Sequence, residues 1–324
     1  MRTIKIKTRT FVLLIPFWAA IISPVQAEAV RISIVKPNAG VYLGPKIIAK
    51  AQMGQEFMSM EKRGTWYSIS VMVKGERKVG WIKTSDVLVV ERKMESLPAQ
   101  LPAGLRQADG KIASIKDGAV IVYIPAGKFI MGDRRALLLG KVKKMTLPDF
   151  FIDVYEVTNA QYTQFVKATG HKKPPYAYNK AMNKPRQPIV GVSYADADAY
   201  ARWAGRRLPT SEEWEKAARG INGFAFPWGK DPATTDHTVI GLKLGEGSPQ
   251  TVGSKPLDKS PFGVFDMAGN VKEWTSTATG IGRRTVRGAA WAYSVKKASL
   301  NLAYNTPESK ADGLIGFRCA VSGQ

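Results

Sequence analysis

The chain has 324 residues, of which 44% are hydrophobic, with 19 prolines and 30 glycines. This length suggests about two domains, and the composition excludes a collagen-like or a disordered chain. The formal net charge of +22 favours anionic partners. A generally basic solvated surface is the alternative, because the lysines are scattered along the chain.

The first residues predict a secretory signal peptide. Four basic residues precede a short apolar run at 11–23, and Val25-Gln26-Ala27 offers a cleavage site after Ala27. The run is shorter than the roughly 17–25 residues that span a bilayer; an uncleaved N-terminal anchor is the alternative. No second long apolar run follows, so we expect the mature chain to be periplasmic or secreted and not membrane-spanning.

Residues 28–92 predict a small β-barrel, because short alternating segments at 30–34, 64–71 and 78–82 are separated by glycine-containing turns. The motifs Gly54-Gln55-Glu56, Gly64-Thr65-Trp66-Tyr67 and Val79-Gly80-Trp81-Ile82 resemble those of bacterial Src-homology-3-like domains. Such domains are usually binding modules for cell-wall peptides or other ligands. Under that resemblance Trp66 and Trp81 are either ligand-stacking residues or packing residues of the core and rim.

Residues 93–116 lack an apolar period and are interpreted as a linker. Beyond them we expect a strand at 119–124 and three capped helices. The first helix begins at Thr158 with Gln161 three residues later, the second at Ser193, and the third at Thr210 with Glu213. After residue 226 frequent Gly, Pro and Asp predict a loop-rich α+β domain.

Motifs across residues 117–324 resemble the formylglycine-generating-enzyme, or sulfatase-modifying factor, superfamily. They are Ile124-Pro125-Ala126-Gly127-Lys128-Phe129, Asp153-Val154-Tyr155-Glu156-Val157-Thr158-Asn159, Gly205-Arg206-Arg207-Leu208-Pro209-Thr210, Pro227-Trp228-Gly229, Asp266-Met267-Ala268-Gly269-Asn270-Val271-Lys272-Glu273-Trp274 and Gly316-Phe317-Arg318-Cys319. The resemblance implies a loop-rich α+β fold related to C-type lectins.

The superfamily's copper enzymes use two cysteines that fall here on Tyr293 and Ala298. A phenol and a methyl group cannot replace the thiolates that Cu(I) prefers, and Cys319 belongs to a different motif. An iron-binding branch uses three histidines, whereas this chain has only His171 and His237, which we interpret as solvated loop residues. We therefore expect neither copper nor iron.

The resemblance also implies a structural calcium site. Asp266 and Glu273 would supply carboxylates, and Gly269 and Val271 would supply backbone carbonyls, since calcium prefers oxygen ligands. The alternative is that the two carboxylates cap or salt-bridge the turn without a metal. This chain departs from the pattern of the family's second calcium loop, where it has Asp236-His237-Thr238-Val239.

The expected cleft of the family is basic and aromatic in this chain, which suits an anionic ligand. Surface charge with core aromatics is the alternative. The candidate ligand-binding residues are Lys272, Arg287, Trp291, Tyr293 and Asn305.

Two hypotheses of function follow. The first is an exported binding or accessory protein, a pseudoenzyme that recognises an envelope protein or an anionic cell-wall or glycan ligand, with no nucleic acid expected. The second is a periplasmic enzyme without the thiol pair, similar to the pyoverdine-maturation type, with Tyr293 or Tyr304 as the catalytic candidate. A phenol is a poor base at its ordinary pKa near 10.

Overall fold

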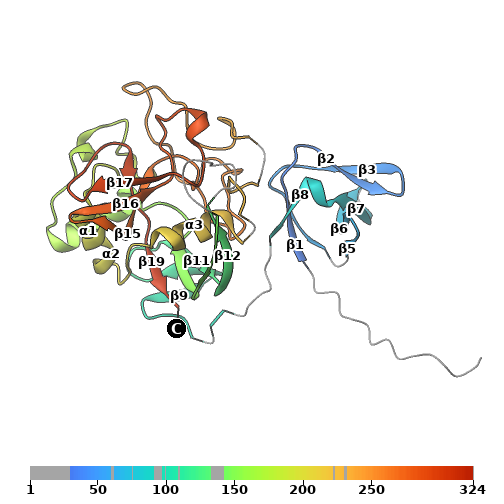
Figure 1. Cartoon of the computed structure of the whole chain (residues 1–324), viewed down its shortest axis with the longest axis horizontal. Helices are drawn as coiled ribbons and strands as arrows, with labels where there is room; N and C mark the ends of the chain where they lie inside the picture. Colours follow the sequence, from blue (N-terminus) through green and yellow to red (C-terminus); the bar gives the residue numbers. More distant parts are fainter. Residues whose placement is uncertain are drawn as a thin grey trace, which may run out of the picture.

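The chain forms a small N-terminal unit and a larger C-terminal domain, joined by a connection between them (Figure 1). The computed structural model describes residues 30–59, 62–74, 76–90, 97–98, 100–108, 110–132, 142–221, 223–229 and 232–323. The expected signal peptide at 1–27 lies outside these residues. In the part that is described, no helix is long and apolar enough to cross a membrane.

The described part of the N-terminal unit consists of β-strands and one short 3₁₀ turn. Its strands are β1 (Val30–Ile34), β2 (Ala39–Leu43), β3 (Lys46–Ala51), β4 (Glu56–Ser59), β5 (Lys62–Arg63), β6 (Trp66–Val73), β7 (Glu76–Lys83) and β8 (Val87–Val90), with a 3₁₀ turn η1 (Thr84–Asp86). They form a three-stranded sheet, β4-β1-β8, and a five-stranded sheet, β3-β2-β7-β6-β5. Both sheets contribute to one apolar core that includes Ile32, Val41 and Ile69. The pairing of the described strands gives two sheets and does not by itself show a closed barrel.

The predicted linker is shorter than expected. Two strands, β9 (Leu105–Ala108) and β10 (Lys111–Ser114), lie within 93–116 and pair with each other. Strand β10 also pairs with β11 (Val120–Ile124). Leu105 and Ile112 are buried against Phe151, so these residues belong to the C-terminal domain. The sequence did not show this because two short strands give too little apolar periodicity.

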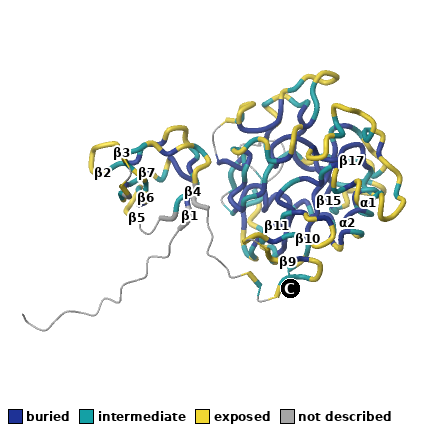
Figure 2. The backbone as a smooth tube through the Cα atoms, turned by 180° about the vertical axis from the view of Figure 1, so that it is seen from behind, coloured by how far each residue is buried: buried dark blue, intermediate teal, exposed yellow. Residues whose placement is uncertain are grey.

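The described part of the C-terminal domain contains three sheets. Its further strands are β12 (Gly127–Met131), β13 (Lys143–Leu147), β14 (Phe150–Asp153), β15 (Lys272–Gly280), β16 (Arg283–Arg287), β17 (Ala303–Pro307), β18 (Ile315–Gly316) and β19 (Ala320–Ser322). The sheet orders are β19-β14-β11-β10-β9, β12-β13 and β17-β16-β15-β18. Long irregular segments connect them, as expected for a loop-rich α+β domain, and dark blue buried backbone fills the interior of the domain in Figure 2.

The three predicted helices are present as α1 (Asn159–Thr169), α2 (Tyr194–Trp203) and α3 (Ser211–Arg219). Each begins at a complete capping box, on Thr158, Ser193 and Thr210, which satisfies otherwise unpaired N–H groups. Two 3₁₀ turns, η2 (Pro175–Tyr178) and η3 (Val295–Lys297), complete the helical elements. Helices α1 and α2 pack with Trp274 of β15 in one core cluster.

Candidate functional site

Strand β15 begins directly after the turn at residues 266–271 and places Lys272 at its first position. Asp266 and Asn270 adopt left-handed backbone conformations, with φ of 62° at each, which Asp and Asn tolerate better than most residues. Lys272 pairs in parallel with Ile315 of β18. The turn and this pairing fix the point from which the Lys272 side chain extends.

The Lys272 ammonium lies between two tyrosine rings. Its Nζ atom is 5.4 Å from the ring centroid of Tyr293 and 5.4 Å from that of Tyr304. The two rings meet edge to face with centroids 6.2 Å apart. Aromatic faces attract a cation electrostatically, and more strongly where water is excluded. Lys272 is 8% exposed, so this cage positions a largely buried positive charge.

Among the described residues, Lys272 has no carboxylate partner for an ion pair. A buried ammonium is usually paired, because removing a charge from water is costly. Two tyrosine rings only partly compensate for the loss of water. The site can therefore gain free energy by binding an anion, and this is the chemistry that the arrangement favours.

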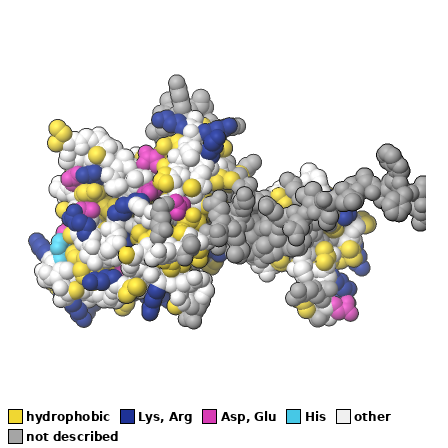
Figure 3. Space-filling view, turned by 90° about the horizontal axis from the view of Figure 1, so that it is seen from below, with side chains coloured by type: hydrophobic (Ala, Val, Ile, Leu, Met, Phe, Trp, Pro, Cys, Tyr) yellow, Lys and Arg dark blue, Asp and Glu magenta, His cyan; other side chains and the backbone are white. Residues whose placement is uncertain are grey.

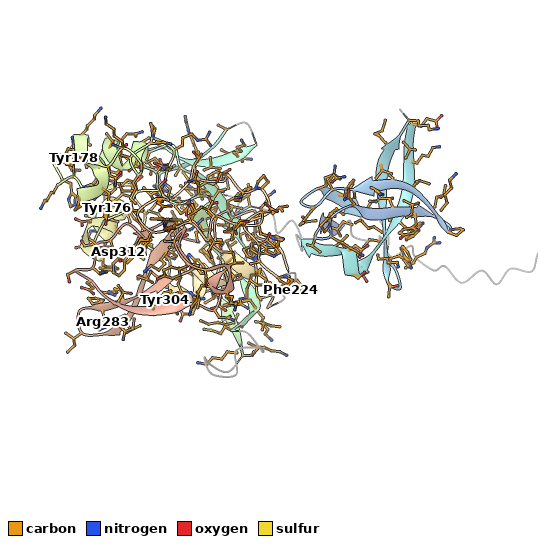
Figure 4. The ribbon with its side chains drawn as sticks, turned by 90° about the horizontal axis from the view of Figure 1, so that it is seen from above. Tyr176, Tyr178, Phe224, Arg283, Tyr304 and Asp312 are labelled. Carbon is orange, nitrogen blue, oxygen red and sulfur yellow. The ribbon has the colours of Figure 1, made fainter. Side chains whose placement is uncertain are left out.

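The hydroxyl of Tyr304 is buried and has no hydrogen-bond partner within the described structure. Burial, and then the neighbouring Tyr293 phenol, raise the pKa of Tyr304 well above its ordinary value. Tyr304 is therefore a poor general base near neutral pH. In Figure 4 Tyr304 lies nearer the middle of the view than Arg283, and its side chain is partly buried.

The other predicted ligand-binding residues lie away from this cage. Arg287 forms a buried ion pair with Glu215 and also donates to the Leu300 carbonyl at 2.8 Å. Trp291 is fully buried, and its Nε1 donates to the Gly313 carbonyl at 3.0 Å. Asn305 is exposed on β17 and accepts a hydrogen bond from Arg283. The structure thus brings together only Lys272 and Tyr293 of the predicted ligand-binding set, with Tyr304 beside them.

The two positions of the superfamily's copper cysteines also come together. Ala298 is buried in a small apolar cluster against which Tyr293 packs. Cys319 lies in a different cluster with Trp274 and Phe317. Within the described ranges, no group of three or more His, Cys, Asp and Glu residues could hold a metal ion. The chain has a single cysteine, so two thiolates from one chain cannot meet at these positions.

The chain matches the family described as sulfatase-modifying factor enzyme 1-like domain over residues 110–322. The chain belongs to this family. The match begins at the start of β10, within the segment interpreted as a linker. This agrees with the pairing of β10 with β11, which makes β10 part of a sheet of the C-terminal domain.

Both inactive and active members of the family are similar to this chain. Inactive C-alpha-formylglycine-generating enzyme 2 of Mus musculus is 31% identical over 265 residues, which cover 62% of this chain and 85% of the relative. Formylglycine-generating enzyme of Streptomyces coelicolor is 29% identical over 281 residues, covering 61% and 88%. Among solved structures, PvdO from Pseudomonas aeruginosa has a TM-score of 0.57 and 25% identity, covering 69% of this chain and all of PvdO.

This sulfatase-modifying-factor-like domain buries four carboxyl groups around Glu273 of β15. They are here called the acidic cluster: Glu156, Asp258, Asp266 and Glu273. All four are at most 1% exposed. The Arg318 guanidinium binds both oxygens of Glu273, at 2.7 and 2.8 Å. Trp214 Nε1 donates to the same carboxylate at 2.8 Å. One cation therefore lies among four acids.

The remaining carboxyl groups of the acidic cluster hold protons more tightly than usual. Burial, and then the charge of Asp266, raise the pKa of Asp258 to about 8. Burial raises the pKa of Asp266 to about 6. It also raises that of Glu156, with Asp266 as the next cause. Excess negative charge in the cluster must therefore be neutralised by protons or by a cation.

Two carboxylate oxygen atoms of the acidic cluster have no hydrogen-bond donor in the described structure. Asp266 Oδ1 and Glu156 Oε1 are both buried without a hydrogen-bond donor. Glu273 Oε1 accepts from Arg318, and an ionised carboxylate oxygen has a second lone pair. The expected calcium ligands Asp266 and Glu273 both lie in this cluster, but the described side chains do not form a group arranged to hold a metal ion. Glu156, which sequence reasoning did not include, adds a further carboxylate; a shared proton between Glu156 and Asp266 is the alternative.

The interpretation of both histidines as solvated loop residues is wrong for one of them. His171 is partly exposed, and its Nε2 lies 2.8 Å from Asp196 Oδ1. His237 is 8% exposed, and its ring stacks on Trp228 with centroids 4.6 Å apart. The residues next to His237 in the sequence are polar, so the sequence showed no sign of its burial. The burial comes from Trp228 of the Pro-Trp-Gly motif, which packs on the His237 ring.

Proposed function

We propose that this protein is an exported binding or accessory protein whose C-terminal domain recognises an anionic group at Lys272. The observation that carries the proposal is the Lys272 ammonium held between Tyr293 and Tyr304 without a carboxylate partner among the described residues. Phenol and methyl groups at the two copper-cysteine positions argue against thiolate copper chemistry. The similarity to a relative named as inactive agrees with this view.

The N-terminal unit is proposed to act as a Src-homology-3-like binding module. Its all-β sheets and its buried core suit such a role. The basic n-region and apolar run at the start of the chain support a periplasmic or secreted location. An envelope protein or an anionic cell-wall or glycan ligand would then be the partner of the complete protein.

The alternative is a periplasmic enzyme that works without thiols. It is favoured by the buried, unpartnered hydroxyl of Tyr304 and by the similarity to PvdO. The raised pKa of Tyr304 opposes a role as general base, which is why we prefer binding. If an activity is found, Tyr293→Phe separates the two hypotheses, because unchanged activity removes this phenol from the mechanism.

Lys272→Met is expected to weaken binding of the anionic ligand by about 10- to 100-fold, since a hydrogen bond to a charged group contributes about 1.5–3 kcal/mol. The chain from residue 28 is incubated with envelope extract of the source organism, and bound material is identified by native mass spectrometry. Lys296→Met changes an exposed lysine of η3 and is the matched control.

Equal retention by parent and Lys272→Met would refute the proposed site. If the bound compound is chemically converted instead of being recovered unchanged at one equivalent, the result would support the alternative hypothesis of an enzyme. Copper or iron recovered at stoichiometry with the parent protein would overturn the binding proposal itself.

We also propose that Asp266 and Glu273, with the carbonyls of Gly269 and Val271, hold one structural calcium ion, as the family resemblance implies. The described side chains are not arranged as a metal-binding group, so binding would require the acidic cluster, including Glu156, to rearrange. At pH 8, calcium at 100-fold over its dissociation constant should stabilise the fold by about 2.7 kcal/mol relative to chelator. Differential scanning calorimetry measures this shift. The variant Asp266→Asn should reduce this calcium-dependent stabilisation, and asparagine tolerates the left-handed backbone conformation at this position.

Glu246→Gln, at an exposed position outside the acidic cluster and outside both calcium loops, is the control for this experiment and should keep the full calcium response. Identical melting in calcium and in chelator, together with no calcium in elemental analysis of the parent, would rule out the calcium site. Proton sharing between Glu156 and Asp266 would then remain as the way in which the cluster is neutralised.

A further inference from the structure

One face of the five-stranded sheet β3-β2-β7-β6-β5 is directed away from the N-terminal core. Tyr67, Ile69 and Ile82 occupy the core face. Successive side chains of a strand point to opposite faces, and cross-strand partners share a face. The other face, called here the outer face, therefore includes Tyr42, Ile47, Lys50, Trp66, Met72, Val79, Trp81 and Lys83.

The centre of the outer face is aromatic and its cations are held against the rings. Tyr42 and Trp66 meet edge to face with centroids 5.2 Å apart. Lys83 Nζ lies 5.6 Å from the Trp66 ring and 6.0 Å from the Tyr42 ring. The Arg63 guanidinium lies 5.1 Å from the Trp81 ring. These contacts order long basic side chains in advance of any binding, which lowers the entropy lost when an anion is bound.

Aliphatic side chains on the outer face are unusually exposed. Ile47 is 48% exposed, Val79 60% and Met72 62%. The solvent face of an antiparallel sheet is normally polar, and contiguous exposed apolar surface marks an interaction site. Figure 3 shows yellow hydrophobic side chains next to blue Lys and Arg on the visible side of the small unit.

Acidic residues do not contribute to the outer face. Across β2, β3, β5, β6 and β7 the only acid is Glu76. It pairs with Val73, whose register places it on the opposite face, and its carboxylate lies 3.2 Å from Lys78 Nζ. The charge of the outer face is therefore positive, with Lys50 and Lys83 exposed beside the rings.

We propose that the outer face binds the surface of a bilayer that contains anionic lipids. Tyr and Trp favour the water–lipid interface, exposed aliphatic side chains enter the headgroup and acyl boundary, and Lys and Arg attract anionic headgroups. A hydrophilic sugar polymer would not account for the exposed aliphatic side chains of Ile47, Met72 and Val79. The lipid surface accounts for the rings, the aliphatics and the cations together.

The test uses the chain from residue 28, which keeps every described element and lacks the apolar signal segment. Sedimentation with vesicles of phosphatidylcholine containing about 30% phosphatidylglycerol should show binding that weakens with added salt. The double variant Ile47→Asp with Val79→Asp should weaken partitioning at least about tenfold. Lys83→Glu should reduce it at low salt and have less effect at high salt.

Leu244→Asp is the matched control, because Leu244 is 70% exposed on the C-terminal domain, and it should bind vesicles like the parent. Lys272→Met should also bind normally, so failure of this proposal and failure of the proposed Lys272 site are distinguishable. Thermal melting verifies that each variant is folded. If the double variant does not fold, the single changes Val79→Ser and Ile47→Ser carry the test.

Parent protein that stays in solution with anionic vesicles would overturn the proposal. So would binding that the outer-face variants leave unchanged. Retention by purified peptidoglycan or by a soluble anionic glycan, with no vesicle binding, would assign the outer face to a sugar polymer instead.

Discussion

Replacing Arg318 by methionine is expected to lower the free energy of unfolding by about 3–5 kcal/mol, the usual cost of leaving one partner of a buried ion pair alone. Arg318 is fully buried. Its Nε and Nη2 donate to Glu273, its Nη1 to the carbonyls of Asp153 and Val154, and its Nη2 also to the Phe265 carbonyl. Methionine keeps much of the volume and removes the guanidinium that binds Glu273 of the acidic cluster.

Chemical denaturation in the presence of chelator measures this effect without a contribution from bound cation. Arg318→Lys should cost less, because it keeps the charge but loses the planar fork. The double variant Arg318→Met with Glu273→Gln should recover part of the loss, since removing both charges leaves none uncompensated. Equal stability of the single and double variants would show that the pair is not coupled. If Arg318→Met does not fold, Arg318→Lys and its double variant with Glu273→Gln provide the comparison.

Local patterns predicted the helices well. Each of α1, α2 and α3 begins at a Ser or Thr whose side chain accepts from a backbone N–H three residues later. That signal is contained in four consecutive residues and needs no knowledge of the remaining chain. The turn before Lys272 was also visible, because its motif is contiguous.

Long-range pairing was not visible in the sequence. Glu156 reaches the acidic cluster from the segment after β14, more than a hundred residues before Asp266. Arg287 was expected to face a ligand but contacts Glu215 of α3. Nothing in the neighbours of either residue indicates its partner. The sequence motifs that contain Glu156 and Arg318 were recognised. That these two residues lie close to Glu273 could not be predicted from the sequence and is seen only in the folded structure.

The pH dependence of stability should report on Asp258. Its pKa is raised to about 8 in the folded chain, against about 3.9 for an unperturbed aspartate. Between these values the folded state holds a proton that the unfolded state releases. The free energy of unfolding therefore falls as pH rises through this window, by at most about 1.4 kcal/mol per pH unit for one proton. The loss is complete only above pH 8.

Asp258→Asn keeps a neutral side chain at this position at every pH, so its stability should decline less steeply than that of the parent between pH 6 and pH 8. Both proteins are unfolded with urea in chelator across this range, because a bound cation would compete with the proton. Asp236→Asn, on an exposed loop residue, should follow the parent curve. Parallel curves for the parent and Asp258→Asn would mean that Asp258 is already ionised at pH 6. The acidic cluster would then need a cation, rather than protons, to offset its charge.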